Sequence, residues 1–188
     1  MAPATAGNAV GVERAREVAA EVRDPEMPML TLVDLGVLRD VRVEGDTVVA
    51  SITPTYSGCP AMATMRDDLV HRLTDAGFPH VEVRVVLEPA WSSDWITPHG
   101  RAALHDAGLS APGPARHDAA PGSARDGAAA RASAGPITLT LGPIRRALTC
   151  PRCGSSNTRL ISEFGATACK ALYRCADCLE PFDHVKEI

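Results

Sequence analysis

The chain has 188 residues, 45% of them apolar and only 4% aromatic, which suits one ordinary domain and a small additional module. The formal net charge is −4, divided into −7 for residues 1–109 and +2 for residues 137–188, so the basic excess that dominates nucleic-acid affinity is missing and we expect no nucleic-acid partner. No apolar run approaches the roughly 20 residues that a bilayer requires, and the first ten residues lack a secretory signal, so we expect a cytoplasmic protein without a membrane partner.

The first predicted element is a helix whose apolar residues recur at helical spacing. It should end near Asp24, because Pro25 disfavours a helical conformation in the residue before it. Two strands follow, at about 36–43 and 47–53, joined by a hairpin turn at Glu44-Gly45-Asp46. The apolar face of the helix comprises Val12, Ala15, Val18, Ala19 and Val22.

A second helix is predicted at about 60–76, with Pro60 in its first turn and Gly77 as a left-handed C-terminal cap. A third strand follows at about 81–87, and a short last helix begins near Thr97 and ends at Gly108. The order helix-strand-strand-helix-strand-helix predicts a small α+β domain at 8–109. The helix between the second and third strands is long enough for a right-handed parallel crossover.

Residues 110–136 are expected to form a disordered linker. Of these 27 residues, 21 are Ala, Gly, Pro or Ser, and none is a large hydrophobic residue. Such a segment buries too little surface to offset the entropy lost on ordering. It divides the chain into two parts.

Two CxxC pairs dominate the C-terminal part: CPRC at 150–153 and CADC at 175–178, with 21 residues between Cys153 and Cys175. This spacing predicts a zinc ribbon at 145–188, with Cys150, Cys153, Cys175 and Cys178 as ligands of a structural zinc ion. Iron, alone or in a cluster, is the alternative at the same ligands. Four thiolates leave no open coordination position, so catalysis at this metal is not expected. Short strands are predicted at 157–163, 170–174 and 182–187.

Two further residues of this part leave questions open. Cys169 is a fifth thiol in FGATACKALYRC. It is interpreted either as a small, half-buried residue beside a strand or as a thiol for metal transfer or redox chemistry. His184 lies outside the CxxC spacing and is expected to be a surface histidine without a role.

A sixth thiol, Cys59, lies in ITPTYSGCPAM, where a strand gives way to a helix. At a helix N-terminus, free backbone N–H groups favour a thiolate and should lower the pKa of Cys59. Two interpretations stay open: a functional thiolate, and a small apolar residue packed beside the helix. No histidine is near in sequence to act as its base, which argues against a cysteine hydrolase.

Acidic residues occupy two nearby turns: Asp24 and Glu26 in DPEMP, and Asp34 in LVDLG. Two of these carboxylates and the Cys59 thiolate would suit iron, whereas Asp24 and Asp34 would also suit the capping of backbone N–H groups. No dinucleotide, phosphate-loop, nucleophile-elbow or HExxH motif occurs. The residues therefore favour an accessory or assembly factor over an enzyme.

DPEMPMLTLVDLGVL, ITPTYSGCPAM and VRVVLEPAWSSDWIT together resemble the small domain of Fe–S cluster assembly factors of the SufT and eukaryotic cytosolic type. With the segment CPRCGSSNTRLISEFGATACKALYRCADCLEPFDHVK, the chain resembles the phenylacetate-degradation family PaaD, also called PaaJ. The resemblance implies an accessory role in maturing the multicomponent oxygenase that epoxidises phenylacetyl-CoA. It places the family's reactive cysteine on Cys59 and its acidic motif on Asp24, Pro25 and Glu26.

The resemblance also implies a client: the Fe–S reductase subunit or the diiron oxygenase subunit. Our own hypothesis adds a homodimer, in which two copies of Cys59 would hold iron or a labile cluster transiently. Two other functions compete with maturation. One is a stoichiometric structural subunit of the oxygenase, and the other is a zinc-ribbon protein that binds nucleic acid, against which the charge distribution argues.

Overall fold

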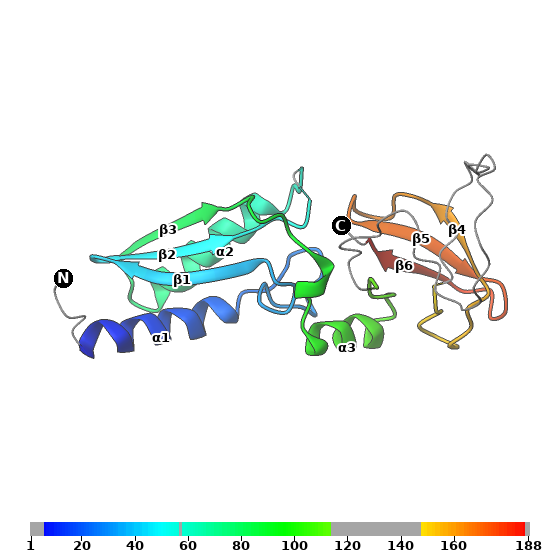
Figure 1. Ribbon diagram of the computed structural model, residues 1–188, viewed down its shortest axis with the longest axis horizontal. Helices are drawn as coiled ribbons and strands as arrows, with labels where there is room; N and C mark the ends of the chain where they lie inside the picture. Colours follow the sequence, from blue (N-terminus) through cyan, green and yellow to red (C-terminus); the bar gives the residue numbers. More distant parts are fainter. Residues whose placement is uncertain (1–5, 57, 114–147, 187–188) are drawn as a thin grey trace, which may run out of the picture.

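The computed structural model describes residues 6–56, 58–113 and 148–186 (Figure 1). The described elements are helices α1 (Ala6–Ala20), α2 (Met62–Asp75) and α3 (Pro98–Asp106), a 3-10 turn η1 (Ser93–Trp95), and strands β1 (Leu38–Glu44), β2 (Thr47–Ile52), β3 (His80–Val85), β4 (Thr158–Ser162), β5 (Lys170–Cys175) and β6 (Pro181–Val185). The predicted order and the mixed α and β class are confirmed. Most of the predicted linker, from residue 114 onward, lies outside the described residues.

The N-terminal part is a three-stranded sheet, in the order β1-β2-β3, with α1 and α2 on one face (Figure 1). β1 and β2 are antiparallel and joined by the predicted turn, where Gly45 has a φ of +68°. β2 and β3 are parallel, as the crossover through α2 predicted. Gly77 has a φ of +96° and closes the C-terminal end of α2 as expected.

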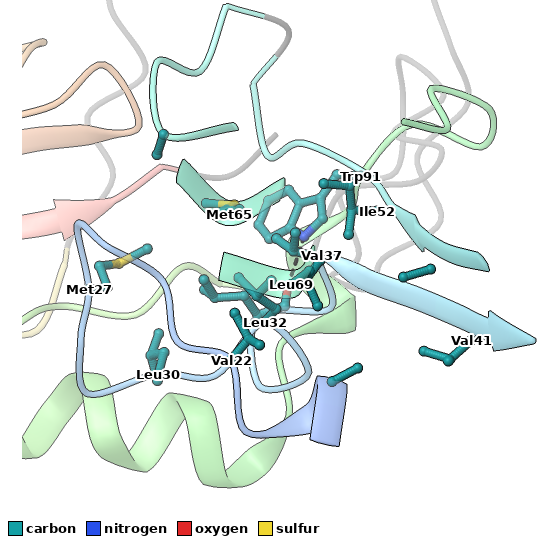
Figure 2. Close-up of a cluster of buried hydrophobic side chains, with 14 of the residues drawn as sticks. Val22, Met27, Leu30, Leu32, Val37, Val41, Ile52, Met65, Leu69 and Trp91 are labelled. Carbon is teal, nitrogen blue, oxygen red and sulfur yellow. Dashed lines mark hydrogen bonds between the residues drawn. The ribbon is translucent and has the colours of Figure 1, made fainter. Parts of the chain in front are cut away.

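The core lies between the helices and the sheet, as Figure 2 shows for Leu69 and Ile52. The predicted apolar face of α1 supplies Ala15 and Ala19, both fully buried. Loop residues between α1 and β1 complete the core, so the DPEMP and LVDLG turns pack against it. Buried residues of these loops are Met27, Leu30, Leu32, Leu35 and Val37.

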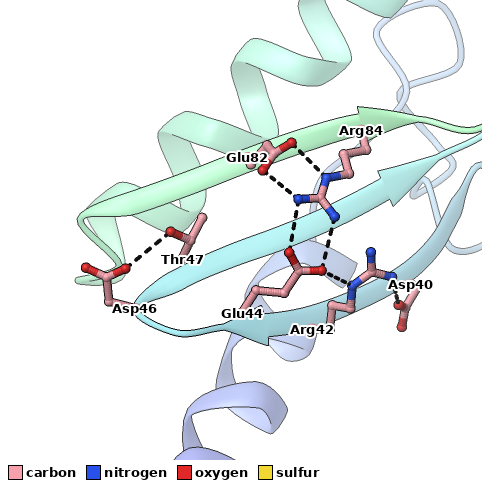
Figure 3. Close-up of polar contacts among 7 residues, drawn as sticks. All are labelled: Asp40, Arg42, Glu44, Asp46, Thr47, Glu82 and Arg84. Atoms are coloured by element: carbon pink, nitrogen blue, oxygen red, sulfur yellow. Dashed lines mark hydrogen bonds and ion pairs between the residues drawn. The ribbon is translucent and has the colours of Figure 1, made fainter.

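The opposite face of the sheet carries charged side chains (Figure 3). Arg84 donates to both oxygens of Glu44, each at 3.0 Å, and also to Glu82 at 2.7 and 2.8 Å. Arg42 joins this network through Glu44 at 2.7 Å. Val49 pairs with Arg42 and Glu82 on this face and is fully buried, because the aliphatic stems of the charged residues cover it.

The C-terminal part is an antiparallel sheet in the order β4-β5-β6. It meets the N-terminal part through Ser110, which follows α3 and forms a parallel bridge with His184 of β6. The backbone N–H of Ser110 donates to Asp183 at 2.9 Å, and that of Val185 donates to Ser110 at 3.0 Å. Val185 is 4% exposed and belongs to the core of the N-terminal part. The two parts therefore share both a hydrogen-bonded edge and apolar packing.

Three expectations need correction here. α1 ends at Ala20 rather than near Asp24, because Pro25 only limits how far a helix can extend, and Arg23 instead forms an antiparallel bridge with Thr31. His184 is not a surface residue: it is 4% exposed, and its Nδ1 lies 3.2 Å from both the backbone oxygen and the hydroxyl of Ser110. The spacing of the cysteines carried no information about this packing against Ser110. The second predicted helix begins at Met62, with Ala61 as its N-cap, so Pro60 lies in a turn before α2.

Candidate functional site

The four cysteines of the ribbon converge on one point. Cys150 and Cys153 precede β4, whereas Cys175 ends β5 and Cys178 lies in the turn before β6. Their sulfurs all lie within 4.8 Å of one another, with 3.7 Å between Cys150 and Cys178 and 3.6 Å between Cys153 and Cys175. Four sulfurs bound tetrahedrally to zinc at ~2.3 Å would stand about 3.8 Å apart. The donor set and its spacing therefore fit a zinc ion.

Backbone hydrogen bonds shape each cysteine turn. The N–H of Gly154 donates to the Cys150 carbonyl at 2.9 Å, and Gly154 has a φ of +74°, as predicted for this turn. The N–H of Cys175 donates to Glu180 at 3.0 Å. Across the two turns, Asn157 donates to Asp177 at 2.8 Å, which ties them together beside the metal position.

The sulfurs differ in acidity without metal. The backbone N–H of Cys178 stabilises the Cys175 thiolate and, with other donors, lowers the pKa of Cys175 to about 7. The N–H of Ser155 favours the Cys153 thiolate in the same way, but the three neighbouring sulfurs raise the pKa of Cys153 to about 12. A bound divalent cation would hold all four sulfurs as thiolates, because thiol ligands lose their protons when they bind a metal.

The DPEMP turn is built on Asp24, which is 4% exposed. Its Oδ1 accepts hydrogen bonds from the backbone N–H groups of Glu26 at 2.8 Å and Met27 at 2.7 Å. Burial raises the pKa of Asp24, although these two hydrogen bonds act against the increase. Asp24 thus caps the turn, as one of the two sequence interpretations expected, and it fixes the backbone that carries Glu26.

Asp34 has the same structural function in the LVDLG turn. It accepts hydrogen bonds from the Thr31 hydroxyl at 2.8 Å and the Thr97 hydroxyl at 2.9 Å, and His99 Nδ1 lies 2.9 Å from Oδ1. Its backbone oxygen accepts from the N–H of Thr97 at 2.9 Å. Asp34 therefore joins this turn to the beginning of α3, which confirms its predicted capping function.

Cys59 lies in the turn between β2 and α2. Its N–H donates to Tyr56 at 3.0 Å, and its side chain is half-buried and packs against the core. The predicted low pKa is wrong. Burial raises the pKa of Cys59, and nearby Glu26, Cys169 and Asp24 add to the increase, while the N–H of Ala61 acts against it. Desolvation prevails because Cys59 lies before the N-cap of α2 and packs against apolar residues.

Cys169 and Lys170 connect the ribbon to Glu26 of the DPEMP turn. The thiol of Cys169 lies 3.9 Å from Glu26 Oε2, and Lys170 Nζ donates to the backbone oxygen of Glu26 at 3.2 Å. Burial raises the pKa of Cys169 as it does that of Cys59, and the negative charges of Glu26 and Asp24 add to both increases. The sequence had left two interpretations of Cys169 open. Lys170 was not considered from the sequence; its only signal is a charge at the start of an apolar strand.

The described part of the chain contains no helix with the length and apolar character needed to cross a membrane.

Two family models match the chain. The model described as iron-sulfur cluster assembly protein matches residues 13–86, and the model described as PaaD zinc beta ribbon domain matches residues 135–186. The first range contains Cys59, and the second contains the four zinc-type cysteines. The predicted resemblance to Fe–S cluster assembly proteins and to the PaaD family is confirmed.

A curated relative agrees with the match to the PaaD ribbon model. A curated protein of Escherichia coli (strain K12), named as one subunit of a "Putative 1,2-phenylacetyl-CoA epoxidase", is 42% identical over 168 residues, which are 89% of this chain and 87% of that protein. Among solved structures, a domain of unknown function, DUF59, from Bacillus anthracis is 26% identical with a TM-score of 0.48, covering 52% of this chain and 94% of its own. A conserved hypothetical protein from Thermotoga maritima is 24% identical with a TM-score of 0.42, covering 49% and 91%.

Proposed function

Because the chain belongs to the PaaD family, we propose that it serves a multicomponent phenylacetyl-CoA epoxidase as an accessory protein that helps to assemble iron or an Fe–S cluster in a client subunit. The proposal rests on the family, on the match of residues 13–86 to an iron-sulfur cluster assembly protein, and on the chemistry of the Cys59 surroundings. Iron is the cargo in this proposal, and the ribbon zinc is structural.

The observation that carries the proposal is the shared environment of Cys59, Glu26 and Asp24. A thiol and a nearby carboxylate are ligands that iron accepts, and a half-buried position limits the access of water. The described zinc-type site has four thiolates and hence no open coordination position, so it offers no place for cargo. Cys59, Asp24 and Glu26 are therefore the proposed iron site, in which Asp24 adds charge and fixes the loop.

The raised pKa of Cys59 suits a carrier of metal. Without a cation, the neutral thiol does not repel Glu26 and Asp24; binding iron releases the proton and forms the thiolate. Because the carboxylates destabilise an empty thiolate, release of iron to a client is coupled to uptake of a proton. We further propose a homodimer in the cytoplasm, with the Fe–S reductase or the diiron oxygenase subunit as client.

The test is client maturation in cells. Cys59→Ser should leave the circular dichroism and the zinc content of the purified protein unchanged, while the iron content and activity of the co-expressed epoxidase fall at least about tenfold. Val70→Ser is a matched control, because Val70 lies on the exposed surface of α2. Full activity of the epoxidase with Cys59→Ser would contradict the maturation proposal.

The alternative of a stoichiometric structural subunit makes a different prediction. In that case, the chain should co-purify with the active epoxidase in equal amounts, and Cys59→Ser should have no effect on the iron content of the complex. A maturation factor should instead be absent from the active complex after its clients are loaded.

A further inference from the structure

Two thiols of the chain take no part in the zinc-type site: Cys59 in the N-terminal part and Cys169 in the ribbon. Both are half-buried, and burial raises the pKa of each, with the charges of Glu26 and Asp24 adding to both increases. Cys169 also adds to the raised pKa of Cys59. Figure 1 shows the reason: the beginning of β5 faces the end of the N-terminal part that carries the loop before α2.

The position of Cys169 is fixed on several sides. Its carbonyl accepts a hydrogen bond from the N–H of Lys186 at 2.9 Å, and the N–H of Lys170 donates to Thr167 at 3.1 Å. Its sulfur lies 3.1 Å from the Thr167 hydroxyl and 3.9 Å from Glu26 Oε2. The thiol is therefore directed from the ribbon toward the acidic turn of the other part.

The backbone of Glu26 is also fixed by hydrogen bonds to both the N-terminal part and the ribbon. Its N–H donates to Asp24 at 2.8 Å, and its backbone oxygen accepts from Lys170 at 3.2 Å. The Lys170 side chain is 6% exposed, so this contact is sheltered from water. The Glu26 carboxylate is then placed beside Cys169 by the same contact that attaches the ribbon.

We propose that Cys59, Cys169 and Glu26 form a second metal site, shared between the two parts of the chain, for a thiophilic divalent cation such as Fe²⁺. The proposal deepens the proposed function and rests on it, because it adds a ligand from the ribbon to the iron site. Two thiolates and one carboxylate suit iron, cobalt or zinc better than magnesium or calcium, which prefer oxygen ligands. Three protein ligands leave a coordination position open to a client, unlike the four-thiolate site.

Binding at this site requires no oxidant. The two thiols each lose a proton to solvent, and two sulfur–metal bonds form. Among the described residues, the four ribbon sulfurs alone lie within 4.8 Å of one another as a potential metal group, so the second site must contract when the cation binds. Cys59 lies outside regular secondary structure, in the turn between β2 and α2, so its approach to Cys169 does not require a helix or strand to break.

The experiment starts from full-length protein carrying one zinc ion and adds Co²⁺ without oxygen, since thiolate-to-cobalt absorption reports the number of bound sulfurs. Wild type should bind one further ion without losing zinc. Cys169→Ser and Cys59→Ser should each reduce that absorption to about half and weaken binding at least tenfold. Glu26→Gln should weaken binding but keep the absorption at saturation. Val70→Ser should behave as wild type, and Fe²⁺ should compete with Co²⁺.

The outcomes separate this inference from the proposed function. If Cys169→Ser keeps the full absorption and affinity while Cys59→Ser loses them, the shared site is wrong and the proposed iron site at Cys59 survives. If wild type binds no second ion, the shared site is wrong, and client maturation with Cys59→Ser decides the proposed function independently. Glu26→Gln keeps the test valid if a serine variant does not fold, because unchanged Co²⁺ affinity in this variant also overturns the shared site.

Discussion

The side chain of Lys170, the first residue of β5, donates a 3.2 Å hydrogen bond to the backbone oxygen of Glu26 in the acidic turn. The lysine is 6% exposed, so its ammonium group has left bulk water to make this contact. Burying a charge without such a partner is costly, and the contact therefore gives the ribbon a preferred position against the N-terminal part.

Replacing Lys170 should loosen that position. Lys170→Met keeps most of the buried chain but removes the charged donor, so we expect a loss of about 1–3 kcal/mol in the free energy of unfolding. Alkylation of Cys169 in the zinc-loaded protein should become faster. Lys186→Met is the control: Lys186 also donates to a backbone oxygen, that of Ala168 at 2.8 Å, but at an exposed position. Equal effects of the two variants would show that the Glu26 contact is not specific.

Removal of zinc should unfold the ribbon. The apolar cluster of this part consists of Cys150, Cys175 and Phe182, with Tyr173 and Cys178 against it, so the metal supplies much of its stability. A chelator should abolish the protection of β5 and β6 amides from hydrogen exchange, while α2 keeps its protection and the N-terminal part its circular dichroism. An unchanged ribbon spectrum after complete zinc removal would contradict this expectation.

Gly36 should be far less replaceable than Gly45, although both have a φ of +68°. A Cβ added at Gly36 would lie 2.5 Å from the Trp95 Cβ and 2.9 Å from the Trp95 oxygen, whereas nothing lies within 4 Å at Gly45. Gly45→Ala should cost about 1–2 kcal/mol of stability for the left-handed conformation alone. Gly36→Ala should cost about 1–3 kcal/mol more for the clash, measured by chemical denaturation. Similar losses for both variants would be evidence against the packing of Trp95 on Gly36.

Asp34 should make stability depend on pH in the acidic range. Burial alone would raise the pKa of Asp34, but hydrogen bonds with His99, Thr31 and Thr97 prevail and hold it at about 2, below the ordinary 3.8. A carboxyl with a lowered pKa stabilises the fold fully above its ordinary pKa and loses this contribution as pH falls toward the folded value.

Asp34→Asn should therefore lower the free energy of unfolding at pH 7 by about 1–3 kcal/mol. Its difference from wild type should shrink between about pH 4 and pH 2. Asp106→Asn, at a side chain that is 84% exposed, should change little at any pH. A constant difference for Asp34→Asn across this range would mean that its ionisation is not the cause.

Local patterns predicted most of the fold. The period of α2, the turn at Gly45 and the spacing from Cys150 to Cys178 are signals carried by neighbouring residues, and the structure confirms each. Elements ended within a few residues of their expected bounds. The end of α1 was expected near Asp24 and lies at Ala20, because Pro25 limits a helix without fixing where it ends. The start of α2 lies two residues later than expected, because Pro60 suits a turn before a helix as well as a first helical position.

The contact between the N-terminal part and the ribbon could not be predicted from the sequence. Glu26 and Lys170 meet across 144 residues, and neither lies in a periodic pattern that points to the other. For the same reason, the burial of His184 was missed and the pKa of Cys59 was predicted in the wrong direction. Position at a helix end is visible in a sequence, but desolvation by distant residues is not.

The bridge between Ser110 and His184 has a consequence for how the polypeptide is connected. Ser110 is followed by the segment that leads to the ribbon, and its partner strand is the last in the described chain. The described contacts that join the two parts therefore lie outside residues 114–147. A backbone cut between residues 113 and 148 would leave them intact, so the two fragments should stay associated as a noncovalent pair.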